Sequence, residues 1–129
     1  MFVNNIMNKF EKSYIYKITC NKTSDIYVGS SYQPKTIRLS KHKTDFKGWQ
    51  GINGNKYRNY RSSFDVLFNE DYDMEIIEMF PCNNKDELLE RESLYIIKGQ
   101  NDNNIKLVNK QIPKKVNYSE DDLSSLVSF

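Results

Sequence analysis

The chain has 129 residues, a formal net charge of +2 at pH 7 and an aromatic content of 13%. This length predicts one domain with a single core and excludes a catalytic domain joined to a separate targeting domain. The mild charge excludes a uniform basic field, so a nucleic-acid site would have to come from local clusters of cations.

The chain contains two cysteines, Cys20 and Cys82, and a single histidine, His42. Without a C-x-x-C pair this set excludes the usual structural zinc sites, and it is typical of a reducing compartment. No apolar stretch approaches the ~20 residues that a membrane span needs, and the start of the chain does not fit a signal peptide. We therefore expect a soluble, intracellular protein without a membrane contact.

Residues 14–20 and 26–29 are two short apolar runs, and the turn-forming residues 21–25 between them predict a β-hairpin. Alternation in the first run places four side chains on one face: Tyr14, Tyr16, Ile18 and Cys20. If the strands pair with Tyr16 opposite Tyr27, the two phenols leave the sheet as direct cross-strand neighbours. Taken alone, such a pair is a contact that stabilises the hairpin.

Pro34 and Gly48 are start and stop signals that predict a helix over residues 35–46. Arg38 and His42 are four residues apart and therefore share one face of this helix. The planar guanidinium suits a phosphodiester because it meets two oxygens and keeps its charge. The nearby lysines fit either a phosphate-binding surface or a solvated basic helix: Lys41, Lys43 and Lys47.

The glycine- and asparagine-rich residues 48–55 predict a loop in which Trp49 either stacks on a base or fills the core. Apolar side chains then recur at helical spacing and predict a second amphipathic helix: Tyr57, Tyr60, Phe64, Leu67 and Phe68. Cations bind the DNA backbone with little regard to sequence. The basic end of this helix therefore adds three candidate phosphate contacts: Lys56, Arg58 and Arg61.

Residues 72–80 predict a third strand. A helix follows, because Asn84 and Glu87 form a capping-box-like start and Gly99 is a natural stop. Glu92 falls in the middle of the apolar stripe of this helix. Since an unpaired buried carboxylate is costly, Glu92 needs a partner, which an internal salt bridge or a metal ion would supply.

Residues 105–109 predict a short extended segment that ends at Asn109, whose amide can hold a loop or orient a catalytic group. Ser119 can cap a small helix near the end of the chain. The elements together predict an α+β fold with a small three-stranded antiparallel β-sheet flanked by helices. We expect three parts: a flexible N-terminal arm (residues 1–13), the main domain (residues 14–113) and a C-terminal tail with a possible short helix (residues 114–129).

These residues resemble, in order, the motifs of the GIY-YIG nuclease family, including small viral or phage homing-type endonucleases. Tyr14-Ile15-Tyr16 and Tyr27-Val28-Gly29 resemble the two motifs that name the family, with Tyr14 in place of the first glycine. Three further matches are the Arg-x-x-x-His pair, the metal-binding glutamate and the late asparagine: Arg38 with His42, Glu92 and Asn109.

The resemblance implies a metal-dependent endonuclease that hydrolyses DNA phosphodiester bonds, with one Mg²⁺ or Mn²⁺ per active site held by Glu92. Arg38 would grip the scissile phosphate, and Tyr27 would orient the phosphate or the water. Either Tyr16 or His42 would take the proton from the attacking water. A phenol with a pKa near 10 is a poor base at pH 7, whereas histidine titrates close to neutrality, so both assignments stay open.

One such site cuts one strand, so we expect a monomer or a transient homodimer on DNA. The main alternative is a non-catalytic nucleic-acid-binding module that keeps the nuclease fold. A further alternative is a small interaction protein whose tyrosine pair belongs to the core. A binding module would give a gel shift with DNA but no cleavage, and an interaction protein would give neither.

Overall fold

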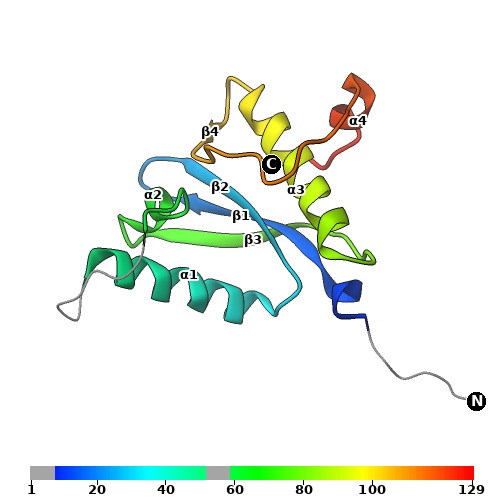
Figure 1. Ribbon diagram of the computed structural model, residues 1–129. Helices are drawn as coiled ribbons and strands as arrows, with labels where there is room; N and C mark the ends of the chain where they lie inside the picture. The colour runs from blue at the N-terminus through cyan, green and yellow to red at the C-terminus, as the bar shows by residue number, and fades with distance from the viewer. Residues whose placement is uncertain (1–7, 52–58) are drawn as a thin grey trace, which may run out of the picture.

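The structure, a computed structural model, describes residues 8–51 and 59–129. Its elements in chain order are η1 (Lys9–Lys12), β1 (Tyr14–Cys20), β2 (Asp25–Ser31), α1 (Lys35–Gln50), α2 (Phe64–Leu67), β3 (Tyr72–Met79), α3 (Lys85–Gln100), β4 (Lys106–Leu107) and α4 (Glu120–Ser124). In this part of the chain the strands form one mixed four-stranded sheet in the order β3-β1-β2-β4. Helices α1 and α2 cover one face of the sheet, and α3 and α4 cover the other (Figure 1).

The predicted hairpin is confirmed, but its register differs from the predicted one. Tyr16 lies opposite Gly29, and Tyr27 lies opposite Ile18. The predicted direct pair of Tyr16 and Tyr27 is therefore wrong, although the two rings remain on one face with centroids 6.4 Å apart. The turn explains the shift, because Ser24 adopts a left-handed conformation with φ of 66° and its N–H donates to the carbonyl of Cys20. Loop length and turn geometry set the register of a hairpin.

The predicted fold class is confirmed, and the sheet carries one strand more than the three predicted. β3 pairs antiparallel with β1 and ends one residue before the predicted boundary. β4 pairs parallel with β2 through Lys106 and Leu107 only. The edge of β2 is therefore covered at its beginning and not along its whole length.

Helix α1 begins at the predicted residue and runs further than predicted. It passes through Gly48 and ends at Gln50, and Gly51 after it supplies the left-handed C-cap with φ of 72°. Trp49 explains the extra turn, because its ring stacks on Phe46 and Phe64 at centroid distances of 6.1 and 5.3 Å. Tertiary packing thus overrides the glycine stop, and Trp49 packs into the core as one of its two predicted alternatives.

The predicted second amphipathic helix is wrong in extent, since α2 has only four residues within the described part of the chain. Tyr60 and Arg61 precede it without helical structure, and Tyr57 lies outside the described residues. Ser62 and Ser63 separate them from the helix, and serine favours turns and caps over helix interiors. Phe64 and Leu67 of the predicted stripe are buried, as is Val66, whereas Phe68, which the stripe also included, is 63% exposed.

Helix α3 starts as predicted, with the side chain of Asn84 accepting a hydrogen bond from the N–H of Glu87 at 3.0 Å. The Glu87 carboxylate accepts in return from Asn83 rather than from Asn84. The helix continues one residue past Gly99, whose missing side chain leaves space for Leu107. Among the described residues, none of the helices has the length and apolar character to cross a membrane.

The core consists of two apolar clusters, one on each face of the sheet. Alternation along β1 assigns Ile15 to the α3 side and its neighbours Tyr14 and Tyr16 to the α1 side, as the sequence predicts. Tyr95 and Ile96 of α3 are fully buried in the first cluster. Side chains from α1 and α3 are thereby separated by the sheet and can meet only around its edge.

Of the expected N-terminal arm, residues 1–13, the structure describes residues 8–13, and these pack against the domain. Residues 1–7 lie outside the described part of the chain. Phe10 is buried, and the side-chain amide of Asn8 donates to the carbonyl of Cys82 at 2.7 Å. At the other end, the predicted small helix is confirmed as α4, which Ser119 caps with a full capping box. Leu123 is buried against the α3 side of the core.

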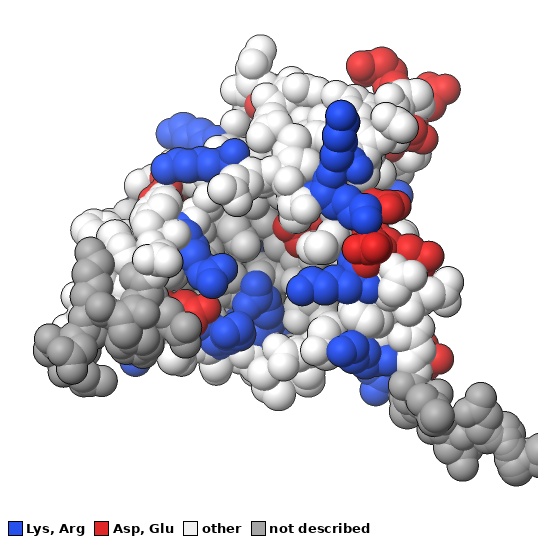
Figure 2. Space-filling model, viewed as in Figure 1, with Lys and Arg blue, Asp and Glu red and all other residues white. Residues whose placement is uncertain are grey.

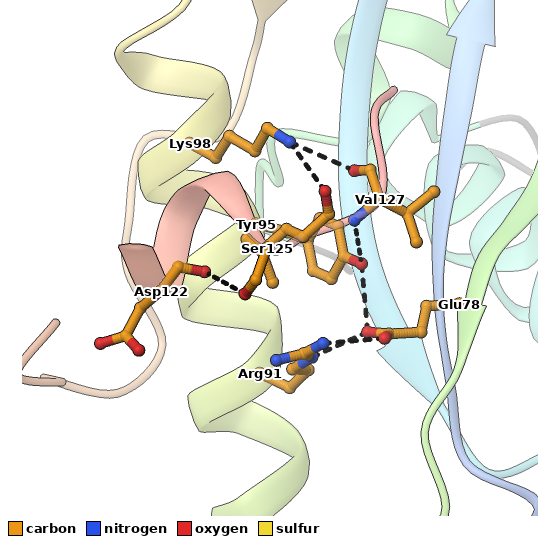
Figure 3. A network of polar contacts seen from close by, with 8 residues as sticks. Glu78, Arg91, Tyr95, Lys98, Asp122, Ser125 and Val127 are labelled. Carbon is orange, nitrogen blue, oxygen red and sulfur yellow. Dashed lines mark hydrogen bonds and ion pairs between the residues drawn. The ribbon is translucent and has the colours of Figure 1, made fainter. Parts of the chain in front are cut away.

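A polar network ties α3 to β3 and to the C-terminal segment (Figure 3). Arg91 donates two hydrogen bonds to the carboxylate of Glu78, at 2.7 and 2.8 Å. Tyr95 Oη donates to the same carboxylate at 3.1 Å and accepts from the N–H of Val127 at 3.2 Å. Lys98 donates to the carbonyl of Leu126 at 3.1 Å. These contacts fix the rotation of α3 and thus the direction of the side chains on its other faces.

We predict that Tyr95→Phe lowers the free energy of unfolding by about 1–3 kcal/mol, because it leaves the N–H of Val127 without its partner and removes one of the donors to the Glu78 carboxylate. Tyr118→Phe is the matched control, since Tyr118 is 44% exposed. The control should change stability by less than about 0.5 kcal/mol. Chemical denaturation of both variants measures the difference, and equal stabilities would contradict the role assigned to this network.

Candidate active site

A cavity of about 500 Å³ opens beside β2, at the edge of the sheet. Its walls come from both sides of the sheet, with Arg38 and His42 on α1, Tyr27 on β2 and Glu92 on α3. Two loop segments, within residues 59–63 and 109–113, complete the lining. Figure 2 shows the hollow near the middle of this face, with Lys and Arg side chains around it. The structure thus brings together side chains that the sheet otherwise separates.

Asn109 determines where the edge of the sheet opens. Its side-chain amide accepts from the N–H of Val28 at 2.9 Å and donates to the carbonyl of Val28 at 2.8 Å. Just before it, the N–H of Val108 donates to the carbonyl of Ile26 at 2.8 Å. The amide therefore extends the parallel pairing by one step after β4 has ended. In this position Asn109 supports the cavity wall and fixes β2 at Val28, directly after Tyr27.

Tyr16 lies beneath the cavity and not on its surface. Its side chain is fully buried, and its Oη is 2.6 Å from Nε2 of His42, which does line the cavity. Gly29 makes this position possible, because a Cβ at residue 29 would come within 2.5 Å of Tyr16 Oη. The glycine of the second predicted motif therefore provides space for the tyrosine of the first.

The cations of the cavity act on His42. Burial, together with the positive charges of Arg38, Arg61 and Lys41, lowers the pKa of His42 to about 3. Burial raises the pKa of Tyr16 well above its usual value of 10. At neutral pH the imidazole and the phenol are both uncharged. A neutral imidazole can accept a hydrogen bond from the phenol at Nε2 when Nδ1 carries the hydrogen. In the other tautomer Nε2–H donates to Tyr16 Oη, and Nδ1 is left free to accept a proton.

Of the two motif tyrosines, Tyr16 and Tyr27, it is Tyr27 that lines the cavity. Its ring meets the His42 ring edge-on, with centroids 5.5 Å apart. Burial, together with the negative charge of Glu92, raises the pKa of Tyr27 to about 12, against the opposite effect of Arg38 and Arg61. Tyr27 therefore keeps its proton at neutral pH and can donate a hydrogen bond to an anion in the cavity.

Glu92 is held by Ser30, whose hydroxyl donates to Oε1 of the carboxylate. Burial raises the pKa of Glu92 to about 7, although Ser30 and the charges of Arg38 and Lys85 lower it. Among the described residues Glu92 forms no ion pair, so the salt-bridge alternative for this residue is not supported. The sequence reasoning assigned no role to Ser30. Alternation along β2 could have identified it, because Ser30 follows Ile26 and Val28 on the face toward α3.

The donor set at Glu92 fits a magnesium-type ion. Mg²⁺ usually keeps several waters and binds through one or two carboxylates together with substrate phosphates. Glu92 offers one carboxylate inside a cavity that is open to solvent. Within residues 8–51 and 59–129 no group of three or more His, Cys, Asp or Glu side chains could hold a metal ion by itself. A cation here would therefore depend on Glu92 and on the substrate.

The cavity carries more positive than negative groups, with four cations and two carboxylates in its lining. Lys41 lies 3.8 Å from Asp45, whereas the other three cations form no ion pair within the described residues: Arg38, Arg61 and Lys110. The sequence reasoning missed Lys110 and Asp45. Two predicted phosphate contacts of α1 do not line the cavity, Lys43 and Lys47, and two more lie outside the described residues, Lys56 and Arg58. The charge balance favours an anionic ligand.

The family model of the GIY-YIG catalytic domain matches residues 12–106. The chain belongs to the GIY-YIG family. This family is one of nucleases, which confirms the resemblance read from the sequence. No curated protein and no solved structure matches the chain. Tyr14, which replaces the first glycine of the GIY motif, is buried and donates to the carbonyl of Gln33 at 2.6 Å, so it does not enter the cavity.

We predict that Gly29→Ala displaces Tyr16 and breaks its hydrogen bond to His42. The cost of overpacking should be about 1–3 kcal/mol in the free energy of unfolding, and the NMR signals of the His42 ring should shift. Gly99→Ala is the matched control, because its new Cβ would meet side-chain atoms of Leu107 at 3.2 Å and Phe129 at 3.4 Å, and no atom closer than that. An unchanged His42 signal in a folded Gly29→Ala protein would refute the contact that we describe for the GIY-YIG glycine.

We also predict that His42 makes stability depend on pH. Its pKa is lowered in the fold, so the stability present above pH 6.5 is lost as pH falls toward about 3. The loss from this group approaches about 1.4 kcal/mol per pH unit. Denaturant titrations at several pH values should show a weaker dependence for His42→Gln over this window. Identical pH profiles for the two proteins would contradict a buried, neutral imidazole.

Proposed function

We propose that this GIY-YIG protein is a metal-dependent endonuclease that hydrolyses DNA phosphodiester bonds in the cavity beside β2. The observation that carries the proposal is that Arg38 and Glu92, from helices on opposite faces of the sheet, line one cavity together with Tyr27 and His42. Hydrolysis requires a nucleophilic water, neutralisation of the charge that develops on the phosphate, and help for the departing oxygen. The four side chains offer a group for each requirement.

Arg38 is the residue that we assign to the scissile phosphate. Within the described residues its guanidinium forms no ion pair, and its Cζ lies 5.9 Å from the centroid of the Tyr16 ring. An arginine without a carboxylate partner keeps its fork of donors available for two phosphate oxygens. Tyr27, with its proton retained, would donate to the same phosphate or to the attacking water.

Glu92 would hold one Mg²⁺ or Mn²⁺, with Ser30 fixing one of its two carboxylate oxygens. A divalent cation at this place supplies neutralisation of the phosphate charge and stabilisation of the leaving oxygen. The chain's own contribution is to aim the carboxylate. Arg91 is the neighbour of Glu92 in sequence, and Tyr95 lies about one helical turn further on. Both donate hydrogen bonds to Glu78, and these bonds fix the rotation of α3.

For the general base we favour His42 over Tyr16. His42 lines the cavity, whereas Tyr16 is fully buried and reaches the cavity only through its hydrogen bond to the imidazole. The cations that depress the pKa of His42 would be neutralised by a bound phosphate. The imidazole then becomes a better proton acceptor at the moment when substrate is present. Tyr16 would act as the partner that fixes the ring.

We predict that the protein nicks supercoiled plasmid when Mg²⁺ is present and that EDTA stops the reaction. Arg38→Ala and Glu92→Gln should each lower the rate at least about 100-fold, as expected for groups that stabilise charge in the transition state. Glu90→Gln is the matched control for Glu92→Gln, because Glu90 is an exposed residue of the same helix and lies outside the cavity.

The outcome separates the candidate functions. Relaxed circles alone indicate a monomer that cuts one strand, and linear products at higher protein concentration indicate a transient homodimer. A gel shift without cleavage would replace the nuclease by a non-catalytic binding module. Full turnover by a folded Glu92→Gln or Arg38→Ala protein would reject the assigned roles.

A further inference from the structure

One wall of the cavity joins two segments that lie far apart in sequence. Lys110 Nζ is 4.8 Å from the centre of the Tyr60 ring and 3.5 Å from Tyr60 Oη. Tyr60 Oη donates its hydrogen to the Asp65 carboxylate at 2.6 Å, so toward Lys110 this oxygen acts as an acceptor. Lys110, Tyr60 and Arg61 all line the cavity. The ammonium of Lys110 is therefore placed at the rim of the cavity by a ring contact.

The backbone of Lys110 is fixed more firmly than its exposed side chain. The preceding residue, Asn109, is bonded through its amide to both backbone groups of Val28. Val28 follows Tyr27 in β2, so the backbone of Lys110 has a defined place relative to Tyr27 in the cavity lining. Its flexible four-carbon stem can move the ammonium while this anchor remains intact.

The charge of Lys110 is not compensated in the structure. Within the described residues it forms no ion pair, and Asp65, which is close to Tyr60, is engaged by the Tyr60 hydroxyl instead. Arg61, the neighbour of Tyr60 in sequence, also forms no ion pair there. Within the described residues, this rim therefore presents two cations without carboxylate partners, Lys110 and Arg61. Both are additional to Arg38, which lines the cavity from α1.

We propose that Lys110, together with Arg61, binds the backbone phosphate next to the scissile phosphate on the same DNA strand. The inference rests on the proposed function and adds a second phosphate subsite to the cavity. Arg38 would hold the scissile phosphate, and the rim would hold its neighbour. Lysine binds phosphate as a mobile point charge, which suits a contact that tracks the backbone without reading the sequence.

This role is one of binding and not of chemistry. Removal of a phosphate contact weakens binding about equally for all sequences and reduces the salt dependence of affinity by about one unit of slope. The Michaelis constant of Lys110→Met should therefore rise while kcat stays nearly unchanged. The methionine keeps an unbranched stem against the Tyr60 ring, so the wall should remain in place.

The test measures the affinity of the full chain for a fluorescently labelled duplex in the Glu92→Gln background, which separates binding from cleavage. Anisotropy titrations between about 50 and about 200 mM salt give both the dissociation constant and its salt slope. Lys110→Met should raise the dissociation constant about 3-fold to 10-fold and reduce the slope by about 0.9. Lys12→Met, the same charge change on an exposed residue outside the cavity, should leave both nearly unchanged.

The variants also separate a charge role from a bracing role. Lys110→Arg should restore the slope. Equal losses for Lys110→Met and Lys12→Met, or a parental slope for Lys110→Met, would overturn the subsite and leave the proposed nuclease function standing. Weaker binding of Lys110→Met that comes with a lower unfolding temperature and an unchanged slope would show that Lys110 only braces Tyr60. Absence of any duplex binding in the Glu92→Gln parent would overturn the inference and the proposed function together.

Discussion

The two hydrogen bonds between the Asn109 amide and the backbone of Val28 end the parallel pairing of the sheet, and the site depends on where they lie. Because β4 contributes only two paired residues, the edge of β2 is open from Gly29 onward. Around this edge, side chains from α1 meet one from α3. A longer β4 would close the edge and keep Arg38 and Glu92 on separate faces of the sheet.

The electrostatics of the cavity show the cost of this arrangement. Burial is the main cause that raises the pKa of Glu92 to about 7 and lowers that of His42 to about 3. In both groups it disfavours the charged form. Neither is paired with an opposite charge among the described residues, and Arg38 is likewise left without an ion pair. Groups held in this way are stabilised by binding, because a phosphate and a cation supply the charges that the protein withholds.

Local sequence signals predicted the elements whose boundaries depend on short-range chemistry. The bounds of β1, the Asn84 cap of α3 and the Ser119 cap of α4 follow from alternation and capping. The hairpin register did not, because it depends on the left-handed conformation of Ser24 in the turn. The end of α1 depends on the packing of Trp49 against residues far along the chain. The motif residues were predictable by resemblance, whereas Lys110 joins the site through contacts between distant segments.

The central claim is that residues from both faces of the sheet share one cation-binding cavity, and paramagnetic broadening by Mn²⁺ tests it most directly. In NMR spectra of the isotope-labelled chain, substoichiometric Mn²⁺ should broaden the signals of Tyr27, His42 and Asn109 as well as those of α3 around Glu92. The Glu92→Gln protein should lose this broadening. Broadening that is confined to the acidic surface of α4, or that persists unchanged in Glu92→Gln, would contradict the account.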